Sequence, residues 1–226
     1  VYHDNNGISI TPFIERIQDL ETLPIQARDL YPHPRRGIFT SRGCPYDCIF
    51  CFSKPFWGPK ARFFSPEYVV KEIVTIVERF NISQLAIYDD LFIAPRTRFK
   101  KMVELIREAG IHEKITFNCN VRPNEVTDEV AELLKSMNIT HVFLGIESGN
   151  QRVLQYLKKQ ACSVEQNSNA IKILKKHGIL THGGFIIGSP DETKEEIMDT
   201  YRFIRKSCID SFSPLMLTPL PGTPIW

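Results

Sequence analysis

The sequence predicts an α/β fold, an open partial TIM-type (β/α)6 barrel with parallel strands. From residue 37 onward, short and nearly continuous apolar runs alternate with helical segments of about 11 to 16 residues, the pattern of a parallel sheet covered by helices. The repeat occurs six times in 226 residues, fewer than the eight units of a closed barrel. A doubly wound sheet is the alternative, and both architectures bind ligands beyond the carboxyl ends of the strands.

The individual elements carry recognisable boundary signals. Ser65 is a typical cap before the first long helix, and the pairs Ser163 with Gln166 and Thr193 with Glu196 are capping boxes. We therefore expect helices at 65–80, 95–109, 127–137 and 163–177, and one that starts after 193. The apolar runs predict strands near 37–40, 84–90, 115–122, 140–148, 181–189 and 211–219.

Residues 1–35 form a lead-in, and residues 36–226 form the (β/α)6 core. The lead-in lacks sustained periodicity and is rich in prolines, charges and other loop-forming residues. We expect it to be an ordered linker that packs on the core through Leu20, Leu23, Ile25 and Leu30. Because the chain starts without a methionine, we also expect a further domain upstream.

The composition narrows the class of protein. Hydrophobic residues make up 42% of the chain, enough for one domain with a full core. The net charge is +2 with scattered basic residues, which does not indicate a nucleic-acid groove. Six cysteines without a regular framework indicate a reducing compartment, and the sequence shows no signal peptide or apolar run of transmembrane length. We expect a cytoplasmic protein without a membrane or nucleic-acid partner.

The stretch CPYDCIFC places three thiols, Cys44, Cys48 and Cys51, at a C-x3-C-x2-C spacing directly after the first predicted strand. Zinc sites and iron–sulfur clusters commonly take four protein ligands, and no fourth cysteine or histidine lies nearby. Three thiolates and one open position are typical of a catalytic metal centre. The alternative is a structural zinc completed by a distant ligand such as Cys119 or His182. His182 begins the fifth strand, away from the mouth, so we expect it to be structural.

Polar side chains follow every predicted strand. In chain order these residues are Cys44, Asp89, Asp90, Asn118, Asn120, Arg122, Glu147, Ser148, Gly188, Asp191 and Thr218. Because the carboxyl ends of parallel strands meet at one edge of a sheet, we expect these groups to converge on one mouth. For any single residue among them, a helix cap or loop role is the alternative.

Several motifs together resemble the radical SAM superfamily over nearly all of residues 37–226. The cysteine loop, with Phe50 before its last thiol, resembles the family's cluster-binding loop. YDDLF at 88–92 is similar to its second-strand motif for the amino group of S-adenosylmethionine (SAM). GIESG, GFIIGSPD and TPLPGTPIW resemble its fourth-, fifth- and sixth-strand motifs, with Asp191 where glutamate is usual.

The resemblance implies a [4Fe–4S] cluster on Cys44, Cys48 and Cys51 that binds SAM and cleaves it reductively to a 5′-deoxyadenosyl radical. It implies an unspecified substrate and an electron donor such as flavodoxin or ferredoxin. Asp89 or Asp90 would accept from the SAM ammonium, Arg122 would pair with its carboxylate, and Glu147 would hold its ribose hydroxyls. The implied cofactor-binding residues are Phe50, Asp89, Asp90, Asn120, Arg122, Glu147, Ser148, Ile187, Gly188 and Thr218.

Within the superfamily, the combined motifs most resemble the branch whose radical domain follows a cobalamin-binding domain. DLETLPIQARDLY at 19–31 resembles the linker between those domains, but the sequence has no cobalamin-binding D-x-H-x-x-G segment. Cobalamin is therefore implied only through an upstream domain, with methylation or rearrangement as the reaction. The alternatives are a methylthiotransferase-like enzyme that modifies RNA or protein and, from another class, a zinc-stabilised binding module.

Overall fold

The computed structural model describes residues 2–4, 7–9, 15–30, 37–159 and 162–226. Its main sheet contains β3 (Gly37–Ile38), β6 (Gln84–Ile87), β7 (Thr116–Val121), β8 (Ile139–Glu147), β9 (Leu180–Ile187) and β10 (Ser211–Met216). The strand order is β10-β9-β8-β7-β6-β3, and every neighbouring pair is parallel. The predicted open six-stranded parallel sheet is confirmed.

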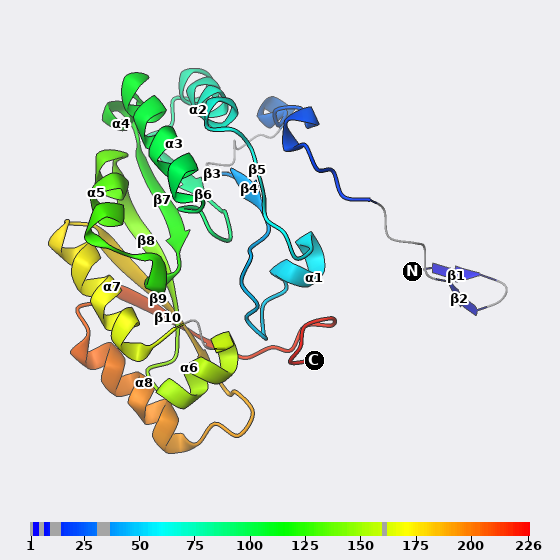
Figure 1. Cartoon of the computed structure of the whole chain (residues 1–226), viewed down its shortest axis with the longest axis vertical. Coiled ribbons are helices and arrows are strands. Elements are labelled where there is room, and N and C mark those ends of the chain that lie inside the picture. The colour runs from blue at the N-terminus through cyan, green and yellow to red at the C-terminus, as the bar shows by residue number, and fades with distance from the viewer. Residues whose placement is uncertain (1, 5–6, 10–14, 31–36, 160–161) are drawn as a thin grey trace.

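Eight α-helices are described: α1 (Ser53–Trp57), α2 (Pro66–Phe80), α3 (Arg96–Glu108), α4 (Ile111–Lys114), α5 (Asp128–Ser136), α6 (Gln151–Lys158), α7 (Val164–Lys176) and α8 (Lys194–Lys206). In Figure 1, α2, α3, α5, α7 and α8 follow the outer side of the sheet, whereas α1 and the C-terminal segment lie on the opposite side. Two small antiparallel pairs join β1 (Tyr2–Asp4) to β2 (Gly7–Ser9) and β4 (Ser41–Arg42) to β5 (Arg62–Phe63). The short 3-10 helices are η1 (Leu20–Thr22), η2 (Arg28–Leu30) and η3 (Pro123–Glu125).

The helix starts follow the predicted caps. The Ser65 hydroxyl accepts a hydrogen bond from the Tyr68 N–H at 3.1 Å, which satisfies one of the free donors at the start of α2. Both predicted capping boxes, at Ser163 and Thr193, are present at the starts of α7 and α8. Local side-chain chemistry therefore fixes where these helices begin.

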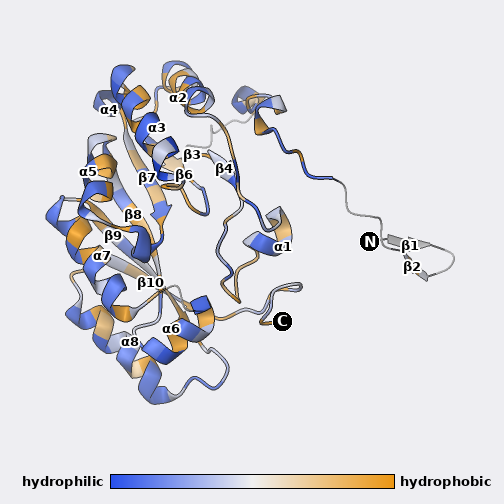
Figure 2. Ribbon diagram, viewed as in Figure 1, coloured by the Kyte–Doolittle hydropathy of each residue, from blue (hydrophilic) through white to orange (hydrophobic). Residues whose placement is uncertain are grey.

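The sheet has one apolar face and one open face. Along β7, Phe117, Cys119 and Val121 are buried, while the alternating Asn118 and Asn120 are only partly buried. Figure 2 shows mixed hydrophilic and hydrophobic residues along the covering helices, as expected for helices with one buried face. The strands therefore build the core on one side and present polar side chains to the barrel interior on the other.

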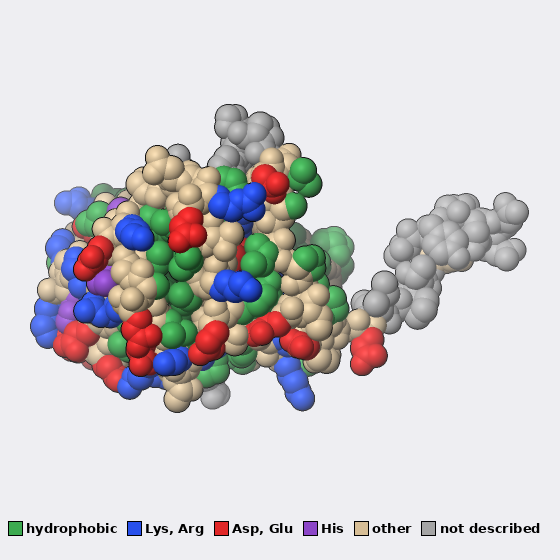
Figure 3. Space-filling model, turned by 90° about the horizontal axis from the view of Figure 1, so that it is seen from above, with side chains coloured by type: hydrophobic (Ala, Val, Ile, Leu, Met, Phe, Trp, Pro, Cys, Tyr) green, Lys and Arg blue, Asp and Glu red, His purple; other side chains and the backbone are tan. Residues whose placement is uncertain are grey.

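The edge strand β10 departs from the predicted buried run. Phe212 is 49% exposed and Met216 is 74% exposed, because β10 pairs only with β9. Figure 3 shows basic and acidic side chains interspersed on the face seen from above, in agreement with the low net charge. No helix among the described residues is long and apolar enough to cross a membrane.

The described part of the lead-in, residues 15–30, packs on α2 through both apolar and charged contacts. Leu20 is buried as expected, but Leu30 is 80% exposed, so that expected contact is wrong. A buried ion pair joins Arg28 to Glu72 of α2 at 2.9 Å. The Glu21 carboxylate also accepts from the Ser65 N–H at 2.8 Å, so polar contacts do much of the anchoring that the apolar residues were expected to do.

Candidate functional site

A cavity of about 550 Å³ opens at the carboxyl ends of the strands. It is lined by the loop that carries the three cysteines, by strand ends, and by one residue of α6. The predicted site residues that line it are Cys44, Cys48, Phe50, Cys51, Asp90, Asn120, Arg122 and Glu147. The expectation that the strand ends share one mouth is therefore met for these eight residues, whereas the roles assigned to them stay predictions.

Asp89 supports the cysteine loop from beneath. Its carboxylate accepts hydrogen bonds from the Thr40 N–H, the Thr40 hydroxyl and, at 2.7 Å, the Ser41 hydroxyl. Asp89 is 1% exposed, and this burial raises the pKa of its carboxyl group despite those three hydrogen bonds. The side chain does not line the cavity, so the structure directs Asp89 to the backbone that leads into the cysteines.

Asp90 takes the opposite direction. It is exposed, lines the cavity, and accepts a hydrogen bond from the Ser53 hydroxyl at 2.6 Å. Of the two adjacent carboxylates that the sequence could not separate, only Asp90 is placed to meet a ligand.

The three thiols of the loop are each partly buried along the cavity wall. Burial raises the pKa of Cys44 to about 11 and also raises the pKa of Cys51. Among the described residues, no three side chains of His, Cys, Asp or Glu are grouped around the position of a single metal ion. The thiols instead form one wall of the cavity. This arrangement fits a cluster that binds one thiolate at each of three irons, and each thiol would lose its proton when the cluster binds.

Arg122 forms hydrogen bonds to the cysteine loop and to two residues outside it. Its Nη1 donates to the Cys48 Sγ at 3.2 Å, its Nη2 to the Cys162 Sγ at 3.3 Å, and its Nε to the Asn124 Oδ1 at 2.9 Å. The guanidinium also lies 3.8 Å from the centre of the Tyr46 ring. Arg122 therefore links the cysteine loop, through Cys48, to Asn124 and Cys162, and its expected pairing with a SAM carboxylate stays a prediction.

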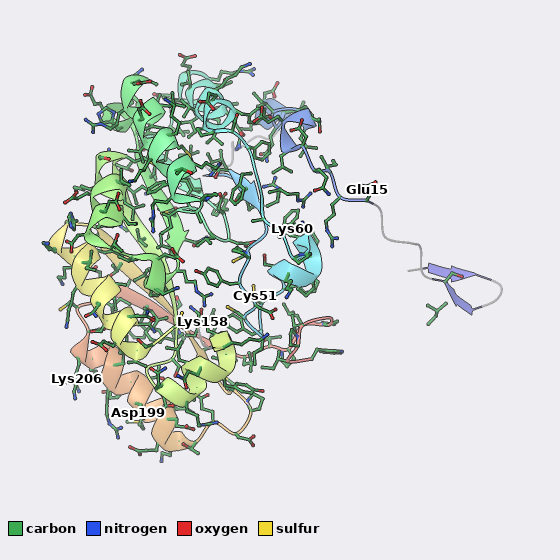
Figure 4. The ribbon with its side chains drawn as sticks, viewed as in Figure 1. Glu15, Cys51, Lys60, Lys158, Asp199 and Lys206 are labelled. Carbon is green, nitrogen blue, oxygen red and sulfur yellow. The ribbon has the colours of Figure 1, made fainter. Side chains whose placement is uncertain are left out.

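A buried ion pair also lines the cavity. The Lys158 Nζ lies 3.3 Å from the Glu147 Oε1 and donates to the Gly145 carbonyl. Glu147 has a φ of 64°, at an irregularity where β8 and β9 change register. Gly145 makes room for the pair, because a Cβ there would lie 2.6 Å from the Glu147 Oε1. Glu147 at this irregularity and Lys158 of α6, which is labelled in Figure 4, therefore both line the cavity.

Lys158 was not among the predicted site residues, which all lie on the cysteine loop or near strand ends. Lys158 is 5% exposed and belongs to the buried stripe of α6 with Val153, Leu154 and Leu157. A lysine in an otherwise apolar helical stripe is unusual unless it is paired, and this was the signal available in the sequence.

Besides Asp89, four predicted cofactor-binding residues lie outside the cavity lining. Ser148 is buried and bonds to Thr200 at 3.2 Å, and the Gly188 N–H donates to Glu192 at 2.7 Å. Ile187 contributes to an apolar pocket against α8, and the Thr218 hydroxyl donates to its neighbouring Met216 carbonyl. The Gly188 and Thr218 contacts are local in the chain, whereas Ser148 and Ile187 contact α8.

Among the described residues, neither distant zinc ligand proposed from the sequence is grouped with the thiols as a metal-ion site. Cys119 faces the helices and is 1% exposed, which raises the pKa of its thiol. His182 lines the cavity, contrary to the expectation that it lies away from the mouth. Its ring contacts the Ser211 and Ser213 hydroxyls and lies 5.3 Å from the Phe143 ring, so its nitrogens are already engaged.

Comparison with curated proteins shows relatives over the whole chain. An uncharacterized methyltransferase of Pyrococcus horikoshii is 33% identical over 100% of this chain and 50% of its own length. The anaerobic magnesium-protoporphyrin IX monomethyl ester cyclase of Cereibacter sphaeroides is 30% identical over 82% of this chain and 30% of its own. The chain thus spans half or less of the length of these relatives.

Solved structures show the same fold. The cobalamin-dependent SAM radical enzyme OxsB matches 91% of this chain and 32% of its own, with a TM-score of 0.77 and 22% identity. The radical SAM methyltransferase TsrM from Kitasatospora setae matches 84% of this chain and 38% of its own, with a TM-score of 0.76 and 19% identity. The family model described as the radical SAM superfamily matches residues 38–204. This chain belongs to the radical SAM superfamily.

Proposed function

We propose that this chain is the radical-generating core of a radical SAM methyltransferase. Cys44, Cys48 and Cys51 would hold a [4Fe–4S] cluster, and the adjoining cavity would hold SAM. The observation that carries the proposal is that the three thiols of one loop line the same cavity as the buried Glu147–Lys158 pair. A cluster site beside one lysine and two carboxylates, Asp90 and Glu147, matches a ligand that carries an ammonium, a carboxylate and ribose hydroxyls.

In this proposal, a different cavity residue binds each polar group of SAM. Asp90 accepts from the ammonium, Lys158 pairs with the carboxylate, and Glu147 accepts from the ribose hydroxyls. Phe50 and Asn120 line the same space and limit how the ligand sits. The bound cluster supplies the electron that breaks the sulfonium C–S bond, and the protein contributes positioning and exclusion of water.

Methyl transfer as the net reaction is supported by the names of relatives. Besides the Pyrococcus horikoshii protein, the cytidylyl-2-hydroxyethylphosphonate methyltransferase of Streptomyces wedmorensis is 29% identical over 82% of this chain. In this proposal residues 1–35 connect the core at 36–226 to an upstream cobalamin-binding domain. An electron donor of the flavodoxin or ferredoxin type would reduce the cluster in the cytoplasm.

Anaerobic reconstitution with iron and sulfide tests the proposal. We expect about four irons and four sulfides per chain, a brown chromophore, and slow formation of 5′-deoxyadenosine from SAM after reduction. Cys208→Ala serves as the control, because Cys208 is exposed and outside the cavity. One zinc per chain without sulfide would contradict the proposal and favour a zinc-stabilised binding module. For the methyl-transfer part, the full-length protein should show a corrinoid absorption band, and its absence would contradict the cobalamin connection alone.

A further inference from the structure

The cysteine loop has a second accessible side. Cys48 and Cys51 line the cavity described above, and they also line a separate groove of about 520 Å³ bounded by α1 and the C-terminal segment. This groove shares Arg16 and Gly58 with a neighbouring hollow of about 370 Å³. We call the two together the α1 groove.

The α1 groove is basic. Arg16, Lys54, Lys60 and Arg62 line it, against the acidic Glu15 and Asp47. Asp47 is in addition ion-paired with both Lys54, at 3.0 Å, and Lys159. Four basic and two acidic side chains line the groove and give it a net charge of +2, as large as that of the whole chain. Basic side chains therefore outnumber acidic ones behind the cysteine loop.

The cysteine loop borders the proposed SAM cavity on one side and the α1 groove on the other. On the cavity side, the thiols share their space with the Glu147–Lys158 pair, which the proposed function assigns to SAM. A cluster held by Cys48 and Cys51 is then screened from large molecules on that side. Electron transfer between proteins becomes slow as distance grows, so a protein reductant has to approach the cluster from the α1 groove.

We infer that the α1 groove is the docking surface for an acidic one-electron carrier protein that reduces the cluster. The inference rests on the proposed function, because it requires a cluster on the three cysteines. The step transfers one electron: the carrier is oxidised by one electron, the cluster is reduced by one electron, and no bond or proton changes place. Interfaces of electron-transfer proteins are small, and opposite charges accelerate their association while salt suppresses it.

The test uses the chain with its reconstituted cluster and a reduced flavodoxin, an acidic flavoprotein, mixed anaerobically in a stopped-flow instrument. Bleaching of the cluster absorption reports the second-order rate constant. The variant Lys54→Glu/Lys60→Glu reverses two exposed charges of the groove. We expect it to lower the rate constant at least tenfold at low ionic strength, and we expect the difference from the parent chain to shrink at high salt.

A matched control separates this effect from the change in total charge. Lys172→Glu/Lys206→Glu makes the same change of charge on exposed positions of α7 and α8, and should reduce at nearly the parental rate. Lys54→Gln/Lys60→Gln should give an intermediate rate constant. The small reductant dithionite needs no docking surface, so it should reduce parent and variants at rates within about twofold of one another.

The outcomes distinguish the two proposals. If dithionite reduces the cluster but flavodoxin reduces the parent, groove and control variants equally fast, the docking surface is wrong and the proposed function stands. If the control pair slows the reaction as much as the groove pair, general charge explains the effect and the docking surface is again wrong. If no cluster assembles in the parent chain, both proposals fail.

Discussion

The guanidinium of Arg122 donates to the Sγ of Cys48 at 3.2 Å and so places a fixed positive charge beside a predicted cluster ligand. Hydrogen bonds to cluster sulfurs are among the features that set reduction potentials. A donor with a positive charge stabilises the reduced cluster, which carries the more negative charge. Arg122 should therefore make the cluster easier to reduce.

Arg122→Gln should shift the cluster's reduction potential to a more negative value, because it removes the charge. The expected shift is on the order of 60 mV, a tenfold change in a one-electron equilibrium. Redox titration followed by electron paramagnetic resonance measures it. Arg122→Lys keeps the charge and should recover part of the shift. Equal potentials in the parent and the Gln variant would show that the contact does not tune the cluster.

Cys44→Ala, Cys48→Ala and Cys51→Ala should each abolish the brown chromophore of the reconstituted chain. The three thiols form one wall of the cavity, and a cluster that loses one of three protein ligands does not assemble stably. Absorbance and iron content provide the measurement. Cys119→Ala and Cys162→Ala should retain the chromophore, and its loss in Cys119→Ala would mean that the ligands are misassigned.

Glu147→Gln should weaken SAM binding while the cluster still assembles. Loss of one charge-assisted hydrogen bond costs about 1.5–3 kcal/mol, which corresponds to roughly ten- to a hundredfold in affinity. Anaerobic calorimetry with the reconstituted chain measures the dissociation constant. Glu165→Gln, on an exposed position of α7, is the control. An unchanged affinity in Glu147→Gln would remove Glu147 from the binding site.

In the cofactor-free chain, Lys158→Met should lower the free energy of unfolding, because it leaves the Glu147 carboxylate buried beside an apolar side chain. The side chains of Lys158 and Glu147 are only 4% and 11% exposed, and breaking a buried pair costs about 3–5 kcal/mol. Urea unfolding measures the loss. The double variant Glu147→Gln/Lys158→Met removes both charges and should regain most of it. A double variant no more stable than the single one would show that the lysine acts through packing alone.

Asp89→Asn should flatten the dependence of stability on pH. Burial raises the pKa of the folded carboxyl above its unfolded value, so the unfolded state releases this proton first as pH rises. The Asp89 contribution to stability is therefore greatest below the unfolded pKa and falls until the pH passes the folded pKa. Urea unfolding from pH 5 to 8 should show that the free energy of unfolding of the variant increases relative to that of the parent as pH rises. Asp90→Asn, next in the chain but exposed, should follow the parent.

The sequence located the sheet because each crossover needs a long amphipathic helix, and such helices have clear caps and periodicity. It missed α1 and the β4–β5 pair, because elements of five and two residues are too short to show a period. It also overestimated the burial of β10. An apolar run indicates that a strand pairs within a sheet, but it does not indicate how many neighbours the strand has.

The candidate site was predictable in part for a similar reason. The cysteines lie on one short loop, so their spacing alone brings them together. Asp89 and Asp90 are consecutive, and only the observed backbone decides which carboxylate turns towards Thr40 and which towards the cavity. Ser148 and Thr218 lie just past strand ends, where the chain has left the sheet and alternation no longer predicts direction. Lys158 lies on a helix, α6, and a search of strand ends and the cysteine loop does not include it.

The order of the strands in the sheet follows their order in the chain, and this has a consequence for biosynthesis. Cys51 leaves the ribosome 96 residues before Glu147, the first member of the Glu147–Lys158 ion pair. At about 5–20 residues per second, that interval is about 5–20 s. During this time the three thiols have no cavity around them and are open to oxidants. The nascent chain therefore depends on a reducing environment, and a completed cluster can be sheltered only after β8 and α6 have been made.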